Sequence, residues 1–221
     1  MTPIPSATLI LLRDTDDGVK TLLLRRNSKS RFLGGCWVFP GGVVEEGDAV
    51  DGEIETACNA AVRETAEEAG IAVDASAILP ISLWVTPEGA PKRFSTWFFV
   101  GGCNRADFCL DGHEVTKGEW VGLQEAISRH HAGEIEIMPP TLVSLMSLLA
   151  FGSTQNALDY YRNRKPRSYF SRAVFQDKQL VMLYPGDAAY ESGDTNLTGR
   201  LHRCLQTDNG WEYINEAGES W

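Results

Sequence analysis

Two short apolar runs near the start of the chain predict a pair of strands. They cover Ala7–Arg13 (ATLILLR) and Lys20–Arg26 (KTLLLRR), and the segment between them, DTDDGV, carries the turn signal Asp-Asp-Gly. Runs of this length on either side of turn residues are typical of a β-hairpin. A polar, glycine-rich loop at Asn27–Trp37 then leads to a short predicted strand at Trp37–Phe39.

The next periodic segment predicts a helix that ends near Gly70. Asp51 is a suitable residue to cap its first turn, and glycine is the usual residue just past a helix end. A stripe of mainly small residues at helical spacing suits packing on a sheet: Ile54, Cys58, Ala61, Thr65 and Ala69.

The rest of the chain mixes strand and helix signals. Two strands are predicted at Ala77–Val85 and Arg93–Gly101, and DGHEVTKGE (111–119) is interpreted as a loop entering a short strand at Trp120–Val121. Helical composition covers three later segments: Gln124–His131, Thr141–Phe151 behind two prolines, and Asn156–Arg162. Four strands follow: Tyr169–Gln176, Gln179–Tyr184, Arg200–Gln206 and Trp211–Ile214. We therefore expect a first domain over residues 1–152 and a β-rich C-terminal extension, 153–221, packed on it.

Composition narrows the class of protein. The chain has 221 residues, 43% of them hydrophobic, and no apolar run of the ~18 residues that span a bilayer. Its apolar start lacks the basic flank of a signal peptide, and its five cysteines are scattered, so we expect a cytoplasmic protein without a membrane partner. The net charge of −10 argues against polymeric nucleic acid but permits a small phosphorylated substrate.

Three glutamates supply the candidate chemistry. Glu64, Glu67 and Glu68 fall at i, i+3 and i+4 and so share one helical face. Glu64 and Glu68 repel each other without a counter-ion, and a Pro-Gly-Gly loop lies upstream. Clustered carboxylates are suitable ligands for Mg²⁺ or Mn²⁺. These ions activate a water molecule to attack phosphate esters and anhydrides. No GxxxxGK[ST] phosphate loop is present, which disfavours a P-loop kinase or ATPase.

The run from Arg63 to Ile71, RETAEEAGI, closely resembles the second half of the Nudix box, REUxEExGU, in which U is aliphatic. Gly41 and Gly42 resemble its glycine start, although Gly42 to Arg63 spans seven residues more than the full pattern Gx5Ex7REUxEExGU allows. Two alignments stay open for the first acid of the box: Asp48, with the insertion after it, or Glu55, with the insertion before it.

This resemblance implies an α/β (α+β) fold with a mixed β-sheet between α-helices. It also implies hydrolysis of a nucleoside diphosphate linked to another moiety. By the same resemblance, Glu64 and Glu68 are metal ligands for Mg²⁺ or Mn²⁺, Glu67 is a further metal ligand or an outer-shell acid, and Arg63 orients the glutamates. The general base is Glu68 itself or Glu114, an acid in the loop before Trp120.

The segment upstream of the box resembles the coenzyme A pyrophosphatase signature, LLTxR[SA]x3Rx3Gx3FPGG. Arg26, Arg31, Gly35 and the run Phe39–Gly42 fit it, and Leu24 and Asn27 depart from it. Together with the insertion and YPGDAAY, this resembles a longer Nudix subfamily of coenzyme A diphosphatases. It implies cleavage of CoA or acyl-CoA into 3′,5′-ADP and (acyl-)4′-phosphopantetheine, with phosphates bound by Arg26 and Arg31 and by the loop at Gly41 and Gly42.

Two other functions compete with this one. A hydrolase of the same fold could act on ADP-ribose, a dinucleotide or a nucleoside triphosphate. A Nudix-fold sensor would bind a nucleotide without hydrolysing it, although the intact REUxEE pattern favours an enzyme. A homodimer is left open.

Overall fold

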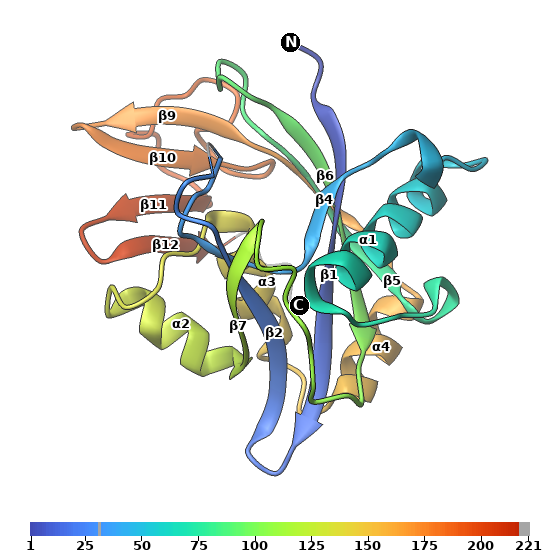
Figure 1. Ribbon diagram of the computed structural model, residues 1–221. Helices are drawn as coiled ribbons and strands as arrows, with labels where there is room; N and C mark the ends of the chain where they lie inside the picture. Colours follow the sequence, from blue (N-terminus) through green and yellow to red (C-terminus); the bar gives the residue numbers. More distant parts are fainter. Residues whose placement is uncertain (31, 217–221) are drawn as a thin grey trace.

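The computed structural model describes residues 1–30 and 32–216 and contains a large mixed sheet (Figure 1). Its strands run in the order β3-β2-β1-β6-β5-β8, with β4 paired to β1 and β7 paired to β2. All pairs are antiparallel except β1 with β6 and β5 with β8. The strands are β1 Ile4–Thr15, β2 Gly18–Arg26, β3 Trp37–Val38, β4 Gly41–Val43, β5 Leu79–Val85, β6 Phe94–Gly102, β7 Val115–Gly122 and β8 Arg167–Phe170.

Both faces of this sheet are buried, and alternate residues of each central strand supply them. In β1, Ile10 and Leu12 belong to one hydrophobic cluster, whereas Leu9 and Leu11 belong to the other. Side chains of a strand point to opposite faces in turn, so an almost continuous apolar run is what two covered faces require.

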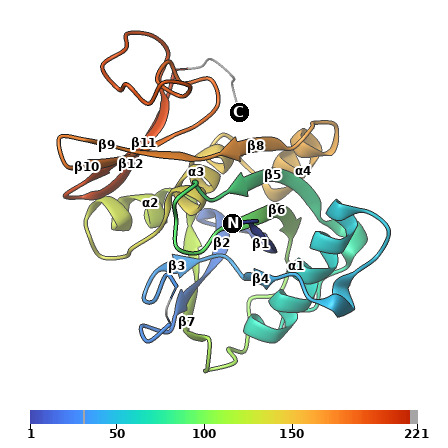
Figure 2. The same ribbon diagram turned by 90° about the horizontal axis from the view of Figure 1, so that it is seen from above.

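Helices cover the two faces in separate layers (Figure 2). Residues of α1 (Glu53–Ala69) pack in the cluster with Leu9 and Leu11, on one face. Residues of α2 (Leu123–His131), α3 (Pro139–Leu148) and α4 (Thr154–Arg162) pack in the cluster on the other face. The expected α+β fold, a mixed sheet between helices with a C-terminal extension of strands, is confirmed.

The extension forms a second, antiparallel sheet in the order β12-β11-β10-β9. Its strands are β9 Arg172–Gln176, β10 Gln179–Leu183, β11 His202–Thr207 and β12 Gly210–Asn215. The backbone N–H of Trp211 donates to Nε2 of buried His130 over 2.8 Å, which joins β12 to α2.

A buried ion pair in the second sheet joins β11 to the segment that follows β10. Arg203 donates to both carboxylate oxygens of Asp187, at 2.7 and 2.6 Å, and both residues are almost fully buried. Asp187 is the acid of YPGDAAY. The segment that looked like a family signature therefore includes a packing element of the extension.

Three local predictions were wrong. Asp51 does not cap α1; the cap position is Gly52, which has φ +114 and no side-chain cap bond. Residues 115–119 form the first part of β7 instead of a loop, because they pair with β2. The predicted strand Tyr169–Gln176 is two strands divided at Ser171, and they belong to different sheets.

The boundary after residue 152 stays a prediction. Two elements beyond it belong with the main sheet: β8 pairs with β5, and α4 packs on the sheet face. The four strands after Ser171 form the second sheet. No helix in the described part of the chain is long and apolar enough to cross a membrane.

Candidate active site

The acidic face of α1 meets the loop at the start of β4. The helix ends at Gly70, which adopts the left-handed conformation with φ +64, as a C-terminal glycine does. Along this helix, Glu68 is buried, Glu64 is half-buried and Glu67 is exposed. The three glutamates therefore lie at different depths on one face.

Glu68 is the buried acid of the site. Its Oε2 accepts a hydrogen bond from the backbone N–H of Gly41 at 3.0 Å, while its Oε1 has no partner in the described structure. Burial raises the pKa of Glu68 to about 7, and the charges of Glu64 and Glu114 add to this rise. The hydrogen bond from Gly41 acts in the opposite direction and lowers the pKa. Burial of a charged carboxylate is costly unless its oxygens are paired, and Oε1 of Glu68 is not paired in the described structure.

Gly41 and Gly42 allow the start of β4 to lie close to the backbone of β1 and to the carboxylate of Glu64. A Cβ on Gly42 would collide with the carboxylate of Glu64, and a Cβ on Gly41 would collide with the carbonyl oxygen of Ala7 in β1. Only glycine permits both approaches without displacement. Gly41 and Gly42 are therefore brought into the site by their lack of a side chain.

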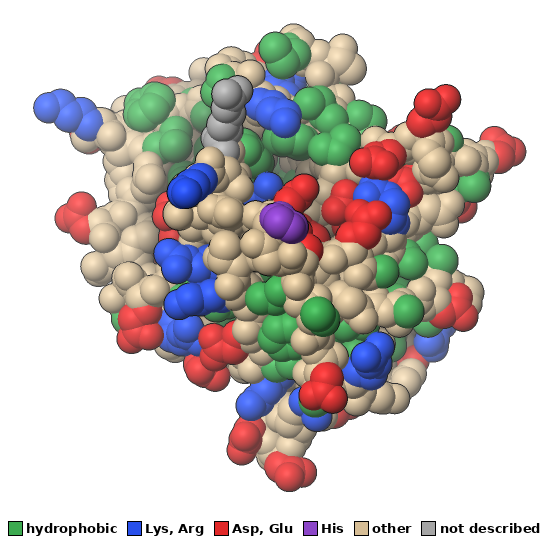
Figure 3. Space-filling view, viewed as in Figure 1, with side chains coloured by type: hydrophobic (Ala, Val, Ile, Leu, Met, Phe, Trp, Pro, Cys, Tyr) green, Lys and Arg blue, Asp and Glu red, His purple; other side chains and the backbone are tan. Residues whose placement is uncertain are grey.

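Arg63 connects the acids. Its Nη1 donates to Glu64 and to Glu67, both at 3.0 Å, and its Nη2 donates to the carbonyl oxygen of Val43 at 2.9 Å. Nε and Nη2 also hold both carboxylate oxygens of Asp48, at 3.0 and 2.9 Å. Figure 3 shows acidic side chains gathered with basic ones on the side of the molecule where α1 lies.

Asp48, not Glu55, is the acid that pairs with Arg63. Asp48 is 4% exposed, and its bonds to Arg63 hold its pKa below the usual value despite burial. Glu55 is exposed and lies over Gly52 at the start of α1. The first of the two alignments of the box therefore agrees with the structure, and the insertion lies after Asp48.

Arg26, the last residue of β2, and Glu114, the residue directly before β7, lie close to the site. The N–H of Asn27, which follows Arg26, donates to the carbonyl oxygen of Glu114 at 2.8 Å. Arg26 lowers the pKa of Glu68 and Glu114 raises it, so both charges lie within electrostatic reach of the buried acid. The Nε of Arg26 is buried without a partner in the described structure. Arg31 lies outside the described residues.

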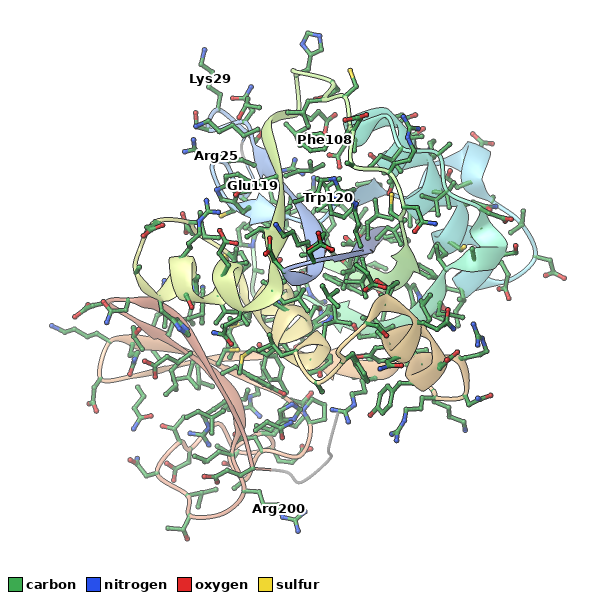
Figure 4. The ribbon with its side chains drawn as sticks, turned by 90° about the horizontal axis from the view of Figure 1, so that it is seen from below. Arg25, Lys29, Phe108, Glu119, Trp120 and Arg200 are labelled. Atoms are coloured by element: carbon green, nitrogen blue, oxygen red, sulfur yellow. The ribbon has the colours of Figure 1, made fainter. Side chains whose placement is uncertain are left out.

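Asp111 was not singled out from the sequence, although it places Glu114. Its carboxylate accepts from the backbone N–H groups of His113, Glu114 and Val115, at 3.0 to 3.2 Å. The signal was present as Asp-Gly at 111–112, the composition of an Asx turn. Near this loop, Phe108 lies against Gly118 of β7, and Trp120, also in β7, donates from its indole N–H to the carbonyl oxygen of Ala106 (Figure 4).

The donor set fits a divalent cation. No group of three acidic, histidine or cysteine side chains among the described residues is already arranged to hold a metal ion, and Arg63 pairs with both Glu64 and Glu67. The buried Oε1 of Glu68 is nevertheless unpaired, and of the nearby charges Glu64 and Glu114 repel this carboxylate while Arg26 attracts it. Hard oxygen donors of this kind suit Mg²⁺ or Mn²⁺.

Comparison with known proteins identifies the family of this chain. The NUDIX domain family model matches residues 3–140. "Putative nudix hydrolase 7" of Caenorhabditis elegans is 24% identical over 84% of this chain and 74% of its own. A NUDIX hydrolase from Alicyclobacillus acidocaldarius has a TM-score of 0.67 at 24% identity, covering 72% of this chain and 96% of that one. The MutT NUDIX hydrolase from Burkholderia pseudomallei has a TM-score of 0.50 at 19% identity, over 66% and 98%.

The family match covers more than half of the chain, so the protein belongs to the Nudix family. It is a Nudix hydrolase, a class that cleaves diphosphate linkages in small nucleotide substrates and generally uses divalent metal ions. The two solved structures share its fold.

Proposed function

We propose that this Nudix hydrolase cleaves the diphosphate linkage of coenzyme A or acyl-CoA, giving 3′,5′-ADP and (acyl-)4′-phosphopantetheine. One observation carries the hydrolytic part. Glu68 is buried with one oxygen held by Gly41 and the other unpaired, beside Glu64, Glu114 and Arg26.

The residues take different roles in this proposal. Glu64 and Glu68 hold Mg²⁺ or Mn²⁺, and Glu67 is an outer acid, because its side chain is 60% exposed and paired with Arg63. The bound ion would neutralise phosphate charge and activate a water molecule. Arg63 positions Glu64, and Asp48 positions Arg63.

Two residues at the rim complete the assignment. Glu114 is exposed, and its charge is near enough to raise the pKa of Glu68. It can therefore accept the proton of the attacking water. Arg26 offers a guanidinium of fixed charge to the substrate phosphates, which such a group can bind bidentately. Arg31, Gly41 and Gly42 are proposed as further substrate-binding residues.

The choice of CoA rests on the upstream pattern and the inserted box. Arg26 and the Phe39–Gly42 run of that pattern reach the same site as Glu68, through β2 and the loop before β4. The cytoplasm is the proposed location.

A substrate panel tests the proposal. Pure protein with Mg²⁺ or Mn²⁺ is incubated with CoA, acetyl-CoA, ADP-ribose, diadenosine tetraphosphate and a nucleoside triphosphate, and products are separated by chromatography. We expect the highest kcat/KM with CoA or acetyl-CoA. Prompt turnover of ADP-ribose with intact CoA would overturn the substrate assignment, and binding of nucleotides without any turnover would indicate a sensor.

A further inference from the structure

A large cavity lies on the face of the sheet opposite α1. Its volume is about 550 Å³, and its walls come from β5, α3, α4 and the segment that leads into β8. Ile81, Trp84 and Val143 in its wall belong to the hydrophobic cluster of the α3 side, whereas α1 packs in the other cluster. None of the candidate active-site residues lines it. Figure 2 shows α1 and α3 on opposite sides of the sheet, and the two sites are therefore separated by the sheet.

The charge around this cavity is opposite to that of the whole protein. The net charge is −10, yet the described lining residues include three basic side chains and no acidic one: Arg164, Lys165 and Arg167. They lie in RNRKPR (162–167), which runs from the last residue of α4 to the first residue of β8. Arg164 lies over the ring of Tyr160, 4.0 Å from its centre, which holds the guanidinium at the rim. A local excess of fixed positive charge attracts an anion in spite of the overall charge.

The interior of the cavity combines hydroxyl groups with an apolar wall. Ser82, Ser144 and Ser147 are buried in its lining. The Oγ of Ser82 accepts from the indole N–H of Trp84 at 3.0 Å, which leaves its own proton available to donate. Trp84 stacks on Tyr169 with centroids 3.8 Å apart, giving a rigid aromatic floor. This volume and mixture are those of a small-molecule site, for which volumes of roughly 300–1,000 Å³ are usual.

We propose that this cavity binds a small phosphorylated ligand of nucleotide size, at a site separate from the catalytic one. Arg164 and Lys165 contact the phosphate, and the apolar wall around Trp84 takes the body of the ligand. An unphosphorylated analogue lacks the group that the basic rim recognises, so it binds weakly. The proposal does not depend on which substrate is hydrolysed.

Protection of Lys165 from acetylation tests this site in the intact protein. The full chain is treated with a limiting acetylating reagent in EDTA, with and without millimolar ADP, and modification is followed by peptide mass spectrometry. Lys178, an exposed lysine in the turn between β9 and β10, is the internal control. We expect ADP to slow acetylation of Lys165 at least fivefold, adenosine to have little effect, and Lys178 to react equally in all samples.

Two variants separate this cavity from the catalytic site. Arg164→Glu should abolish the protection, whereas Arg26→Gln, which alters the catalytic site, should keep it. Equal labelling of Lys165 with and without ADP would overturn the proposal, as would protection that disappears in Arg26→Gln. The wild-type comparison decides the question even if Arg164→Glu fails to fold.

Discussion

The backbone N–H of Gly41 donates a hydrogen bond to Oε2 of Glu68 over 3.0 Å, and this bond joins the glycine loop to the acidic helix. It fixes one carboxylate oxygen and leaves the other, Oε1, buried and unpaired. A bound cation would supply the missing partner. The Nudix loop and helix of this chain therefore act as one unit, although seven inserted residues separate their halves in sequence.

Gly42→Ala should damage catalysis while the fold survives. The added Cβ collides with the carboxylate of Glu64, which must move from its place between Gly42 and Arg63. A displacement of about 1 Å at such a site can cost on the order of 10²-fold in rate. Steady-state kinetics with the best substrate of the panel measure the effect. Gly47→Ala is the matched control, since a Cβ there meets no atom within 4 Å; equal losses in both variants would refute this explanation.

Asp48→Asn should lower activity, and Glu55→Gln should not. Asp48 holds Arg63 through two charge-assisted bonds, and Arg63 in turn positions Glu64. Loss of a partner that orients a metal ligand typically costs about 10–100-fold in metal affinity or activity. Titration of Mn²⁺ against the hydrolysis rate measures both quantities. A larger loss in Glu55→Gln would restore the alternative alignment of the box.

Arg26→Gln should raise KM more than it lowers kcat. The guanidinium is proposed to contact substrate phosphates, and removal of a hydrogen bond to a charged group costs roughly 1.5–3 kcal/mol, about a tenfold or larger rise in KM. Arg25, the neighbour labelled in Figure 4, donates instead to the carbonyl oxygen of Gly35, so Arg25→Gln serves as control. If kcat fell while KM stayed unchanged, the result would indicate that Arg26 acts on the glutamates of the site and does not bind the substrate.

The Asp187–Arg203 pair should dominate the stability of the second sheet. Burial alone would raise the pKa of Asp187, but Arg203 and two backbone N–H groups hold it below its usual value. Asp187→Asn leaves Arg203 buried without its charge partner, so we expect a loss of about 3–5 kcal/mol in urea unfolding at pH 7. Asp159→Asn, which removes an exposed pair with Arg162, should cost about 1 kcal/mol or less.

The pH dependence of that difference has a defined sign. Because the pKa of Asp187 is lowered in the folded protein, its contribution is fully present above the unfolded value of about 3.9. It is lost as the pH falls through the lower native pKa. The gap between wild type and Asp187→Asn should therefore shrink below about pH 4; a gap that stays constant down to pH 2 would show that the lost stability is not electrostatic.

The sequence predicted those parts of the structure in which local pattern and tertiary packing agree. The hairpin of β1 and β2 was found because apolar runs flank a turn, and Gly70 ends α1 as expected. The first part of β7 was missed because Thr116, Lys117 and Gly118 carry no strand signal. Pairing with β2 makes them a strand, and Gly118 lies where a side chain would collide with Phe108.

The candidate site shows the same limit. Glu64, Glu67 and Glu68 could be placed on one face from helical spacing alone. Their different degrees of burial could not be predicted, because they depend on the loop at Gly41, which packs against Glu68 only in the folded chain. The choice between Asp48 and Glu55 also needed the fold, because the insertion makes both spacings acceptable and only the loop brings Asp48 to Arg63.

Hydrolysis by Glu68→Gln is the most direct test of the catalytic proposal. Glutamine keeps the shape and can still accept the Gly41 bond, but it removes the negative charge that a cation needs. We expect the rate to fall on the order of 10²–10³-fold, the size of a lost electrostatic contact to the transition state. The metal-free variant should be at least as heat-stable as the wild type, because an unpaired buried carboxylate has been removed. A folded Glu68→Gln protein that hydrolyses every substrate at the wild-type rate would contradict the proposal.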